Sequence, residues 1–314
     1  APVTPEVDHS HSHLDSAARQ YNPLTRTQER QLNSIRSGIG LIFASEALGC
    51  SHIIEAYKRF IPTDVPEGVT ARCQEIPSKM TNRDQITQWL EHYVQEHQQE
   101  HQQDTRLVAY RPLSNGAKEH LIEQVQAALE VCKRPDKGQR PWLGVAFIFD
   151  PGATWSWLSL PPQYRQAVEG KADVMTSPWR WNASGIQQRL SHHHKLDTDE
   201  VCQQILAATG GWPYLLDVLF YRCGAQNDPR PFAEAIQREI TENSTKLVQQ
   251  FQRCLGLDST ENTHKVLTFI HTRRQVPVSF GSAETNEKEL PLPPVAYNAT
   301  VEYLRRLGCV EMHD

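Results

Sequence analysis

The sequence lacks a long apolar run, a closely spaced cysteine pair and a large excess of charge of either sign. No stretch approaches the ~18 consecutive apolar residues that cross a bilayer. The opening segment APVTPEVDHSHSHLDSAARQ is polar and has no apolar centre of the kind that signal peptides carry. We therefore expect a cytoplasmic protein without membrane contact.

The seven cysteines are scattered, odd in number and never spaced C-x-x-C. This pattern favours a reduced protein over a disulfide framework or a zinc site. The formal net charge is -5, so any nucleic-acid contact must come from a local basic patch and not from the chain as a whole. The sequence also lacks the H-E-x-x-H motif of zinc proteases and the G-x-S-x-G motif of serine hydrolases.

The chain has 314 residues, 39% of them hydrophobic, which is enough for about two domains of roughly 150 residues each. Residues 1–24 carry little apolar content and are expected to form a flexible arm. Beyond them, apolar segments alternate with helical patterns. We expect strands at residues 39–43, 69–76, 106–110, 143–149 and 172–176. We expect helices at residues 25–36, 51–60, 82–98 and 116–132.

Strands that alternate with helices indicate an α/β fold, with a mainly parallel sheet covered by helices on both faces. The segment LGVAFIF at 143–149 is almost continuously apolar, as a central parallel strand should be. After residue 183 the strand patterns fade and successive helices are expected. The tail predicts a helix at 261–275, a short strand at 276–280, a helix at 296–308 and a final strand at 309–314.

Tryptophans cluster in two short segments, TWSWLSL and SPWRWN. Trp155 and Trp157 alternate in the first, and Trp179 and Trp181 alternate in the second. Alternating aromatics are typical of strand ends, of the edge of a core or of an exposed surface that contacts a partner protein.

The segment GLIFASEALGCSHIIEAYKR, at residues 40–59, has the layout of a phosphate-binding loop between a strand and a helix. Such a loop reads G-x-x-x-x-G-K-[ST], and its glycines let backbone N–H groups curl around the phosphates. The second glycine (Gly49) and the final hydroxyl residue (Ser51) are present. The eight positions that would hold the nucleotide are Ala44, Ser45, Glu46, Ala47, Leu48, Gly49, Cys50 and Ser51.

Three of these positions depart from a working loop. Ala44 stands where the first glycine is expected and resists a positive φ angle. Cys50 replaces the lysine and cannot supply its positive charge. Glu46 adds a negative charge that would repel phosphate. The segment is therefore either a nucleotide site that has lost its chemistry or an ordinary strand–loop–helix corner.

Asp150 ends the apolar strand VAFIFD about 100 residues after this loop. In a nucleotide site, an aspartate at the end of such a strand coordinates Mg²⁺, together with the hydroxyl of a residue placed as Ser51 is. The residue after it is Pro151, whereas nucleotide-hydrolysing proteins commonly carry a glutamate there. Asp-Pro-Gly is also good turn chemistry, so a simple turn at the end of a buried strand is the alternative.

The segment LAATGGWPYLLDVLF, at residues 206–220, carries the most specific motif. Thr209, Gly210 and Gly211 would end one helix, and Pro213 would open the next at a position where its missing N–H costs nothing. This element resembles the T-G-G-x-P-x-L-L segment of the helical lid in AAA+-like and STAND-class ATPases. In these families a winged-helix domain follows the lid, and the tail from residue 261 has the same order of elements.

The resemblance implies four parts: an arm at residues 1–24, a P-loop NTPase-like α/β domain at 25–182, a helical lid at 183–243 and a winged-helix-like domain at 244–314. It places Gly49 and Ser51 at the phosphates and Mg²⁺, and Asp150 at the ion. Thr154 and Ser177 are candidates for a sensor position. Arg180 and Arg189 are candidates for an arginine finger that acts on a neighbouring subunit, with an ordinary surface arginine as the alternative.

The winged-helix candidate has a possible reading helix at residues 296–307. Its apolar side chains, Tyr297, Val301, Leu304 and Leu307, are expected to face inward. Asn298, Glu302, Arg305 and Arg306 are expected to face outward. The residues that would contact DNA phosphates are Arg273, Arg274, Asn298, Arg305 and Arg306. Glu302 opposes such binding, and protein contact is the more common outcome in STAND-class relatives.

These observations predict a pseudo-ATPase that serves as a scaffold or adaptor in a larger homo- or hetero-oligomeric assembly, associated with DNA or with bacterial defence. It would hold ATP or ADP with Mg²⁺, or no nucleotide at all. One alternative is a working ATPase whose lysine comes from elsewhere, such as Lys58, Lys118 or a neighbouring subunit. Another is a DNA-binding regulator that acts through the winged helix.

Overall fold

The computed structural model describes residues 35, 38–58, 70–100, 105–114, 118–132, 142–176, 180–242, 246–256, 261–272 and 290–310. The strands are β1 (Gly38–Phe43), β2 (Thr70–Glu75), β3 (Thr105–Leu113), β4 (Trp142–Phe149) and β5 (Val174–Thr176). The helices of the first half are the 3-10 turn η3 (Glu46–Leu48), α2 (Cys50–Lys58), α3 (Arg83–Glu100), α4 (Lys118–Cys132), α5 (Pro151–Leu158) and α6 (Pro162–Glu169). Those of the second half are α7 (Ala183–His192), α8 (Asp199–Thr209), α9 (Pro213–Cys223), α10 (Arg230–Glu242), α11 (Lys246–Leu255), α12 (Glu261–Thr272) and α13 (Pro294–Arg306).

The strands form one parallel five-stranded sheet in the order β2-β3-β4-β1-β5. The register places Phe43 of β1 beside Phe149 of β4, so both strands end at the same edge of the sheet. Parallel neighbours need crossover connections, and the helices between the strands provide them. The prediction of a parallel α/β sheet with β4 at its centre is confirmed.

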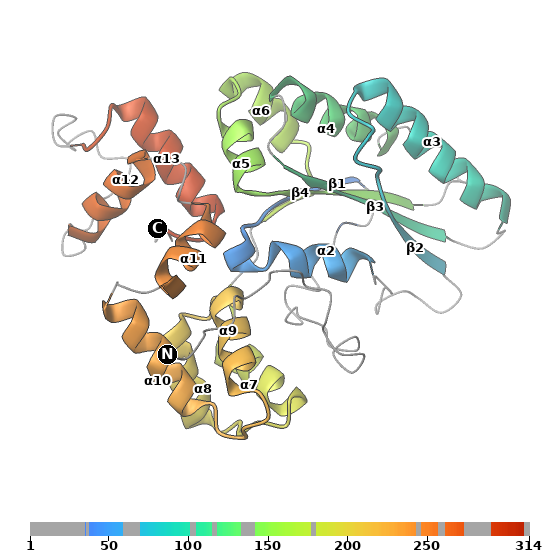
Figure 1. The fold of residues 1–314 in the computed structure, drawn as a ribbon. Helices are drawn as coiled ribbons and strands as arrows, with labels where there is room; N and C mark the ends of the chain where they lie inside the picture. The colour runs from blue at the N-terminus through green and yellow to red at the C-terminus, as the bar shows by residue number, and fades with distance from the viewer. Residues whose placement is uncertain are drawn as a thin grey trace, which may run out of the picture.

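Helices cover both faces of this sheet (Figure 1). Helices α3, α4 and α5 lie on one face, and α2 lies on the other. Successive strand residues point to opposite faces, so Leu41 and Phe43 pack toward α3–α5, whereas Ile42 packs toward Ile53 and Tyr57 of α2. Because both faces are buried, β1 and β4 are nearly continuous apolar runs.

A second core lies among α7, α8, α9 and α10, and the amphipathic helix α11 packs its apolar side against it. Thr209 ends α8, and Gly210 and Gly211 follow with φ angles of 59° and 71°. Pro213 then opens α9. The predicted helix–glycine–proline–helix segment is therefore present at the expected residues.

A third, small core joins α12 to α13, and its buried members are Val266, Tyr297, Val301 and Leu304. The inward orientation predicted for the apolar side of α13 is confirmed, since Leu307 is buried as well. The carboxyl-terminal end of α13 also lies against α5. The last unit, α12 and α13, therefore contacts the α/β unit, which consists of the sheet with α2–α6, directly (Figure 1).

Two predictions differ from the structure. Trp155 and Trp157 lie in helix α5, not at strand ends, because Asp150 caps that helix and Pro151 begins it. Residues 309 and 310 form no strand. Apart from residue 35, the helix expected at 25–36 lies outside the described residues, as does the strand at 276–280, and the four predicted parts of the chain remain predictions. Among the described residues, no helix is both long and apolar enough to cross a membrane.

The glycine pair after α8 gives a prediction on stability. A Cβ atom at Gly211 would lie 2.0 Å from the carbonyl oxygen of Trp181, so Gly211→Ala combines an unfavourable φ with a backbone clash. We expect it to lower the free energy of unfolding by about 3 kcal/mol. Gly224→Ala is the control, because Gly224 also has a positive φ but nothing lies within 4 Å of its added Cβ. Its cost should be about 1 kcal/mol. Equal costs in urea unfolding would contradict this account.

Candidate functional site

The segment that resembles a phosphate loop joins β1 to α2 at the carboxyl edge of the sheet, as expected. It does not form an open cradle. Ser45 caps a single 3-10 turn, Glu46–Leu48, and Gly49 follows in the left-handed conformation with a φ of 81°. Helix α2 then begins at Cys50.

Backbone carbonyls of the loop itself accept three of the amide hydrogens that could otherwise bind a phosphate. The N–H of Leu48 donates to the carbonyl of Ser45 at 3.0 Å, and that of Gly49 donates to the carbonyl of Glu46 at 3.0 Å. The N–H of Cys50 donates to Ser45 as well, at 3.0 Å. Upstream, the N–H of Ala44 donates to Phe149 of the neighbouring strand at 2.9 Å. These four donors are therefore already satisfied within the fold.

The tip of the loop is buried in an apolar contact between different parts of the chain. Ala47 is 0% exposed and Leu48 is 2% exposed. A Cβ atom at Gly308, beyond α13, would lie 3.2 Å from the side chain of Leu48. A Cβ atom at Gly49 would lie 3.4 Å from Pro213, the first residue of α9. Helix α11 also lies against the turn. The loop thus packs between the α/β unit and both helical units.

The residues at the lysine and Mg²⁺ positions have other contacts. Cys50 is buried, and burial raises the pKa of its thiol, with further increases from the negative charges of Glu46 and Asp150. The hydroxyl of Ser51 donates a hydrogen bond to the Glu46 carboxylate at 2.7 Å. Cys50 therefore offers no positive charge to a phosphate, and the Ser51 hydroxyl already donates its hydrogen to Glu46.

Asp150 serves as the N-cap of α5. Its carboxylate accepts a hydrogen bond from the Ala153 N–H at 2.6 Å, and its own N–H donates to Leu113 of β3 at 3.0 Å. Partial burial raises the pKa of Asp150, the amides of Ala153 and Gly152 oppose this increase, and Glu46 adds to it. The loop and the strand end therefore bring two carboxylates together at the carboxyl edge, and residues 44–51 contain no lysine or arginine.

Comparison with solved structures identifies the fold. The ORC2 protein of Aeropyrum pernix, in its ADPNP–ADP complexes, aligns with 95% of this chain and 91% of its own length, with a TM-score of 0.50 and 13% sequence identity. A Walker-type ATPase of Pyrococcus abyssi aligns with 90% of this chain and 89% of its own, with a TM-score of 0.43 and 12% identity. The fold of the chain is therefore similar to that of the ORC2 protein, with a parallel sheet in the order β2-β3-β4-β1-β5. No family model and no curated protein sequence matches it.

Within this fold, the sensor and finger candidates are separated. Thr154 is fully buried in α5, where its hydroxyl donates to the Asp150 carbonyl at 2.7 Å. Ser177 lies outside the described residues. Arg180 is exposed and stacks on Trp212 at 5.5 Å. Arg189 is 6% exposed, so it does not reach a neighbouring subunit and the finger expectation for it is wrong.

Arg189 instead belongs to a polar link between the α/β unit and the helical unit formed by α7–α11. It donates to one carboxylate oxygen of Asp217 on α9 at 2.5 Å. The other oxygen of Asp217 lies 3.1 Å from Nε2 of His52 on α2. Helix α2, which follows the loop, is therefore tied to α9 by a shared carboxylate.

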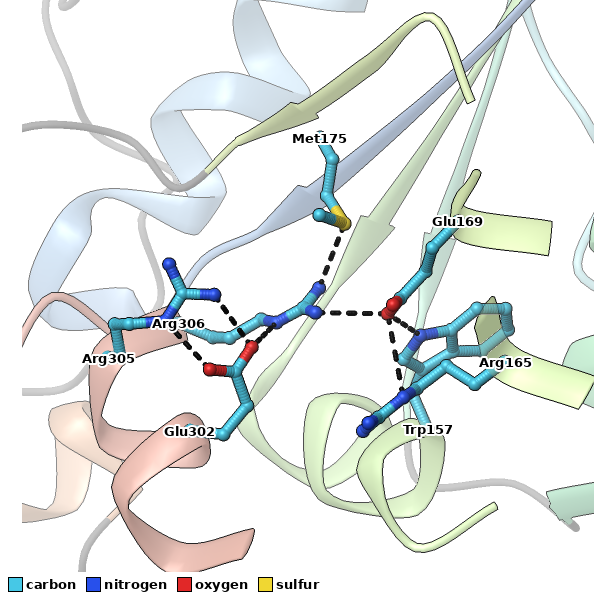
Figure 2. A network of polar contacts seen from close by, with 7 residues as sticks. All are labelled: Trp157, Arg165, Glu169, Met175, Glu302, Arg305 and Arg306. Carbon is cyan, nitrogen blue, oxygen red and sulfur yellow. Dashed lines mark hydrogen bonds and ion pairs between the residues drawn. The ribbon is translucent and has the colours of Figure 1, made fainter. Parts of the chain in front are cut away.

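The candidate DNA-contacting residues that the structure describes do not form one surface. Arg273 and Arg274 lie outside the described residues. Asn298 and Arg305 are exposed as predicted, but Arg305 donates twice to the carboxylate of Glu302, at 2.7 and 2.8 Å. The expectation that Arg306 faces outward is wrong. It is 6% exposed and points into the contact with the α/β unit, because two carboxylates meet it there (Figure 2).

Sequence reasoning missed the two charge clusters that join the units, around Asp217 and around Arg306. The Glu302–Arg306 spacing of four residues predicts a pair on one helix face. The partner that draws Arg306 inward is Glu169, which is 137 positions away. No local pattern in the sequence points to that contact.

The Asp217 link gives a prediction on pH dependence. Desolvation raises the pKa of Asp217, but the charge of Arg189 and hydrogen bonds from His52 and Arg189 outweigh it and hold the pKa at about 2, below its usual 3.8. A depressed carboxyl pKa stabilises the fold above pH 3.8, and this contribution disappears as the pH falls toward 2. We expect Asp217→Asn to lower the free energy of unfolding by about 1 kcal/mol at neutral pH, since the side chain is partly exposed.

The difference between wild type and Asp217→Asn should shrink as the pH falls from about 5 to about 3. Asp228→Asn is the control, because Asp228 also pairs with an arginine, Arg230, but links no two units. Denaturant titrations at each pH measure both variants. A constant effect of Asp217→Asn across this range would contradict the assigned charge link.

Proposed function

We propose that this chain is a catalytically degenerate AAA+-like scaffold or adaptor that does not depend on bound nucleotide and works within a larger assembly. The observation that carries the proposal is the satisfied loop: the amides of Leu48, Gly49 and Cys50 donate to carbonyls of the loop itself. A phosphate would have to break these three bonds in order to use these amides.

Charge supports the same proposal. A phosphate loop attracts its ligand with a lysine and with amide dipoles. Here the lysine position holds a buried thiol, and the carboxylates of Glu46 and Asp150 increase the negative charge around it. Asp150 alone would suit a bound Mg²⁺, but the carboxylate of Glu46 lies in the loop itself, and residues 44–51 carry no lysine or arginine to offset the charge of a triphosphate. The residues present therefore do not fit a Mg-nucleotide, and we derive no hydrolytic step.

The packing of the loop supports a structural role in its place. Leu48 lies against Gly308, and Gly49 lies against Pro213, so the turn holds both helical units on the α/β unit. In a protein built this way, apolar contacts at the turn hold the units together. Such an arrangement suits a subunit that presents surfaces to other chains.

We propose protein partners, in a homo- or hetero-oligomer, as the main contacts of this scaffold. The candidate DNA helix supports this choice, because Arg305 pairs with Glu302 and Arg306 is buried. Association with DNA or with bacterial defence would then come through the assembly. A working ATPase remains the alternative from the enzyme class. Its local lysine candidate Lys58 pairs with Glu55 at the far end of α2, about 12 Å along the axis from Cys50.

The proposal predicts how the chain responds to nucleotide and to a restored lysine. Addition of Mg-ATP, Mg-ADP or Mg-GTP should leave the melting temperature of the wild type unchanged, because only a ligand that binds the folded state raises it. Cys50→Lys should lower the free energy of unfolding by about 3–5 kcal/mol, since position 50 is 4% exposed and would bury an ammonium group.

Cys50→Ala is the matched control, and it should cost only about 1 kcal/mol because it removes a single buried sulfur atom. A rise in the wild-type melting temperature with Mg-nucleotide that Asp150→Ala abolishes would overturn the nucleotide-independent scaffold. A stable Cys50→Lys variant that gains nucleotide affinity would show that the loop can open into a phosphate site.

A further inference from the structure

The carboxyl-terminal unit, α12 and α13, contacts the α/β unit where α13 meets α5. Helices α12 and α13 have their own small core. Where α13 meets α5, the buried apolar residues are Leu158, Tyr303 and Leu307, with Trp155 packed edge-on against Tyr303. The hydroxyl of Tyr303 also donates to the carbonyl of Gly256 at 3.2 Å. A cluster of charges lies beside this apolar contact.

Arg306 is the centre of that cluster (Figure 2). Its Nε donates to Glu302 on its own helix at 2.7 Å, and its Nη2 donates to Glu169 of α6 at 3.0 Å. Its Nη1 lies 3.3 Å from the sulfur of Met175 in β5. The guanidinium also stacks 4.3 Å above the ring of Phe43, the last residue of β1. One side chain of α13 therefore contacts three elements of the α/β unit.

On the α/β unit, Glu169 also has partners that do not belong to α13. The carboxylate of Glu169 accepts a hydrogen bond from the indole N–H of Trp157 at 2.9 Å, and Arg165 lies 3.8 Å away on the same helix (Figure 2). Glu169 is only 12% exposed in its side chain, and Arg306 only 6%. A planar guanidinium can satisfy two carboxylates at once, whereas an ammonium group cannot do so with the same geometry.

A buried charge without its partner is far more costly than the pair. If α13 moved away, Glu169 would lose its main counter-charge and Arg306 would lose the ring of Phe43. The contact is thus strong when complete and weak when any member is missing. Interfaces between units that depend on charged side chains in this way allow the units to separate and rejoin.

We propose that Arg306 is an internal latch that holds the unit of α12 and α13 closed over the carboxyl edge of the sheet. The closed state covers Phe43, Leu48 and Leu158, and release of Arg306 exposes them. The latch is a conformational switch built from this chain's own charges. It goes beyond the scaffold role and would stand even if the chain bound nucleotide, because none of its contacts involves the loop amides.

Amide hydrogen exchange of the full chain, read by mass spectrometry, tests the latch. Arg306→Met keeps the length of the side chain but removes its charge and its donors. We expect exchange in peptides from α13 and α5 to rise by about tenfold or more, while peptides from α7–α10 stay unchanged. Glu169→Gln is the second variant and keeps the test available if Arg306→Met fails to fold. It should raise exchange in the same peptides by a smaller factor.

Arg305→Ala is the matched control. Arg305 is the neighbouring arginine on the same helix, and its hydrogen bonds go to Glu302 of that helix, so its removal leaves the Arg306–Glu169 pair in place. Its variant should exchange within about twofold of wild type, as expected for an exposed pair. Unchanged exchange at α13 in both cluster variants would overturn the latch. So would an equal rise in every peptide, because that pattern means global destabilisation without undocking.

Discussion

The burial of Leu48 and the hydrogen bonds around it determine how this fold is assembled. A turn that would otherwise face a ligand is closed by its own carbonyls, and its tip is covered by Gly308 and α11. A buried backbone donor must have a partner, so the amides of Leu48, Gly49 and Cys50 can bind phosphate only by giving up bonds they already make. The same atoms that close the turn position α2, whose His52 reaches Asp217 on α9. Loop, helix and helical unit therefore depend on one local conformation.

Charge complements this apolar centre. Two carboxylates, Asp217 and Glu169, each collect side chains from different units of the chain, with Arg189 and His52 at the first and Arg306 at the second. Ion pairs of this kind add less net stability than apolar packing, because desolvation offsets much of their attraction. These ion pairs instead make the arrangement specific, since each cation pairs with its carboxylate in only one orientation of the units. The fold thus combines an apolar contact at Leu48 with charged contacts at Asp217 and Glu169.

The sequence predicted the α/β unit well, because its signals are local. The continuous apolar run of β4 and the Thr209–Gly211 turn before Pro213 each arise from a few neighbouring residues. The missing lysine at Cys50 was equally visible. Other features were not predictable. The closed turn depends on Leu48 meeting Gly308, and the inward orientation of Arg306 depends on Glu169, 137 positions away. Helix periodicity places Arg306 on a polar face and cannot tell that a carboxylate of another unit covers that face.

The central claim is that the loop amides serve the fold and not a ligand. Exchange of the individual amide hydrogens of Leu48, Gly49 and Cys50, followed by nuclear magnetic resonance with and without Mg-ATP, tests it most directly. The account predicts that all three amides are protected without nucleotide and that Mg-ATP leaves their exchange unchanged, because their acceptors are the carbonyls of Ser45 and Glu46. Amides that exchange freely in the absence of nucleotide and become protected when it is added would contradict the account.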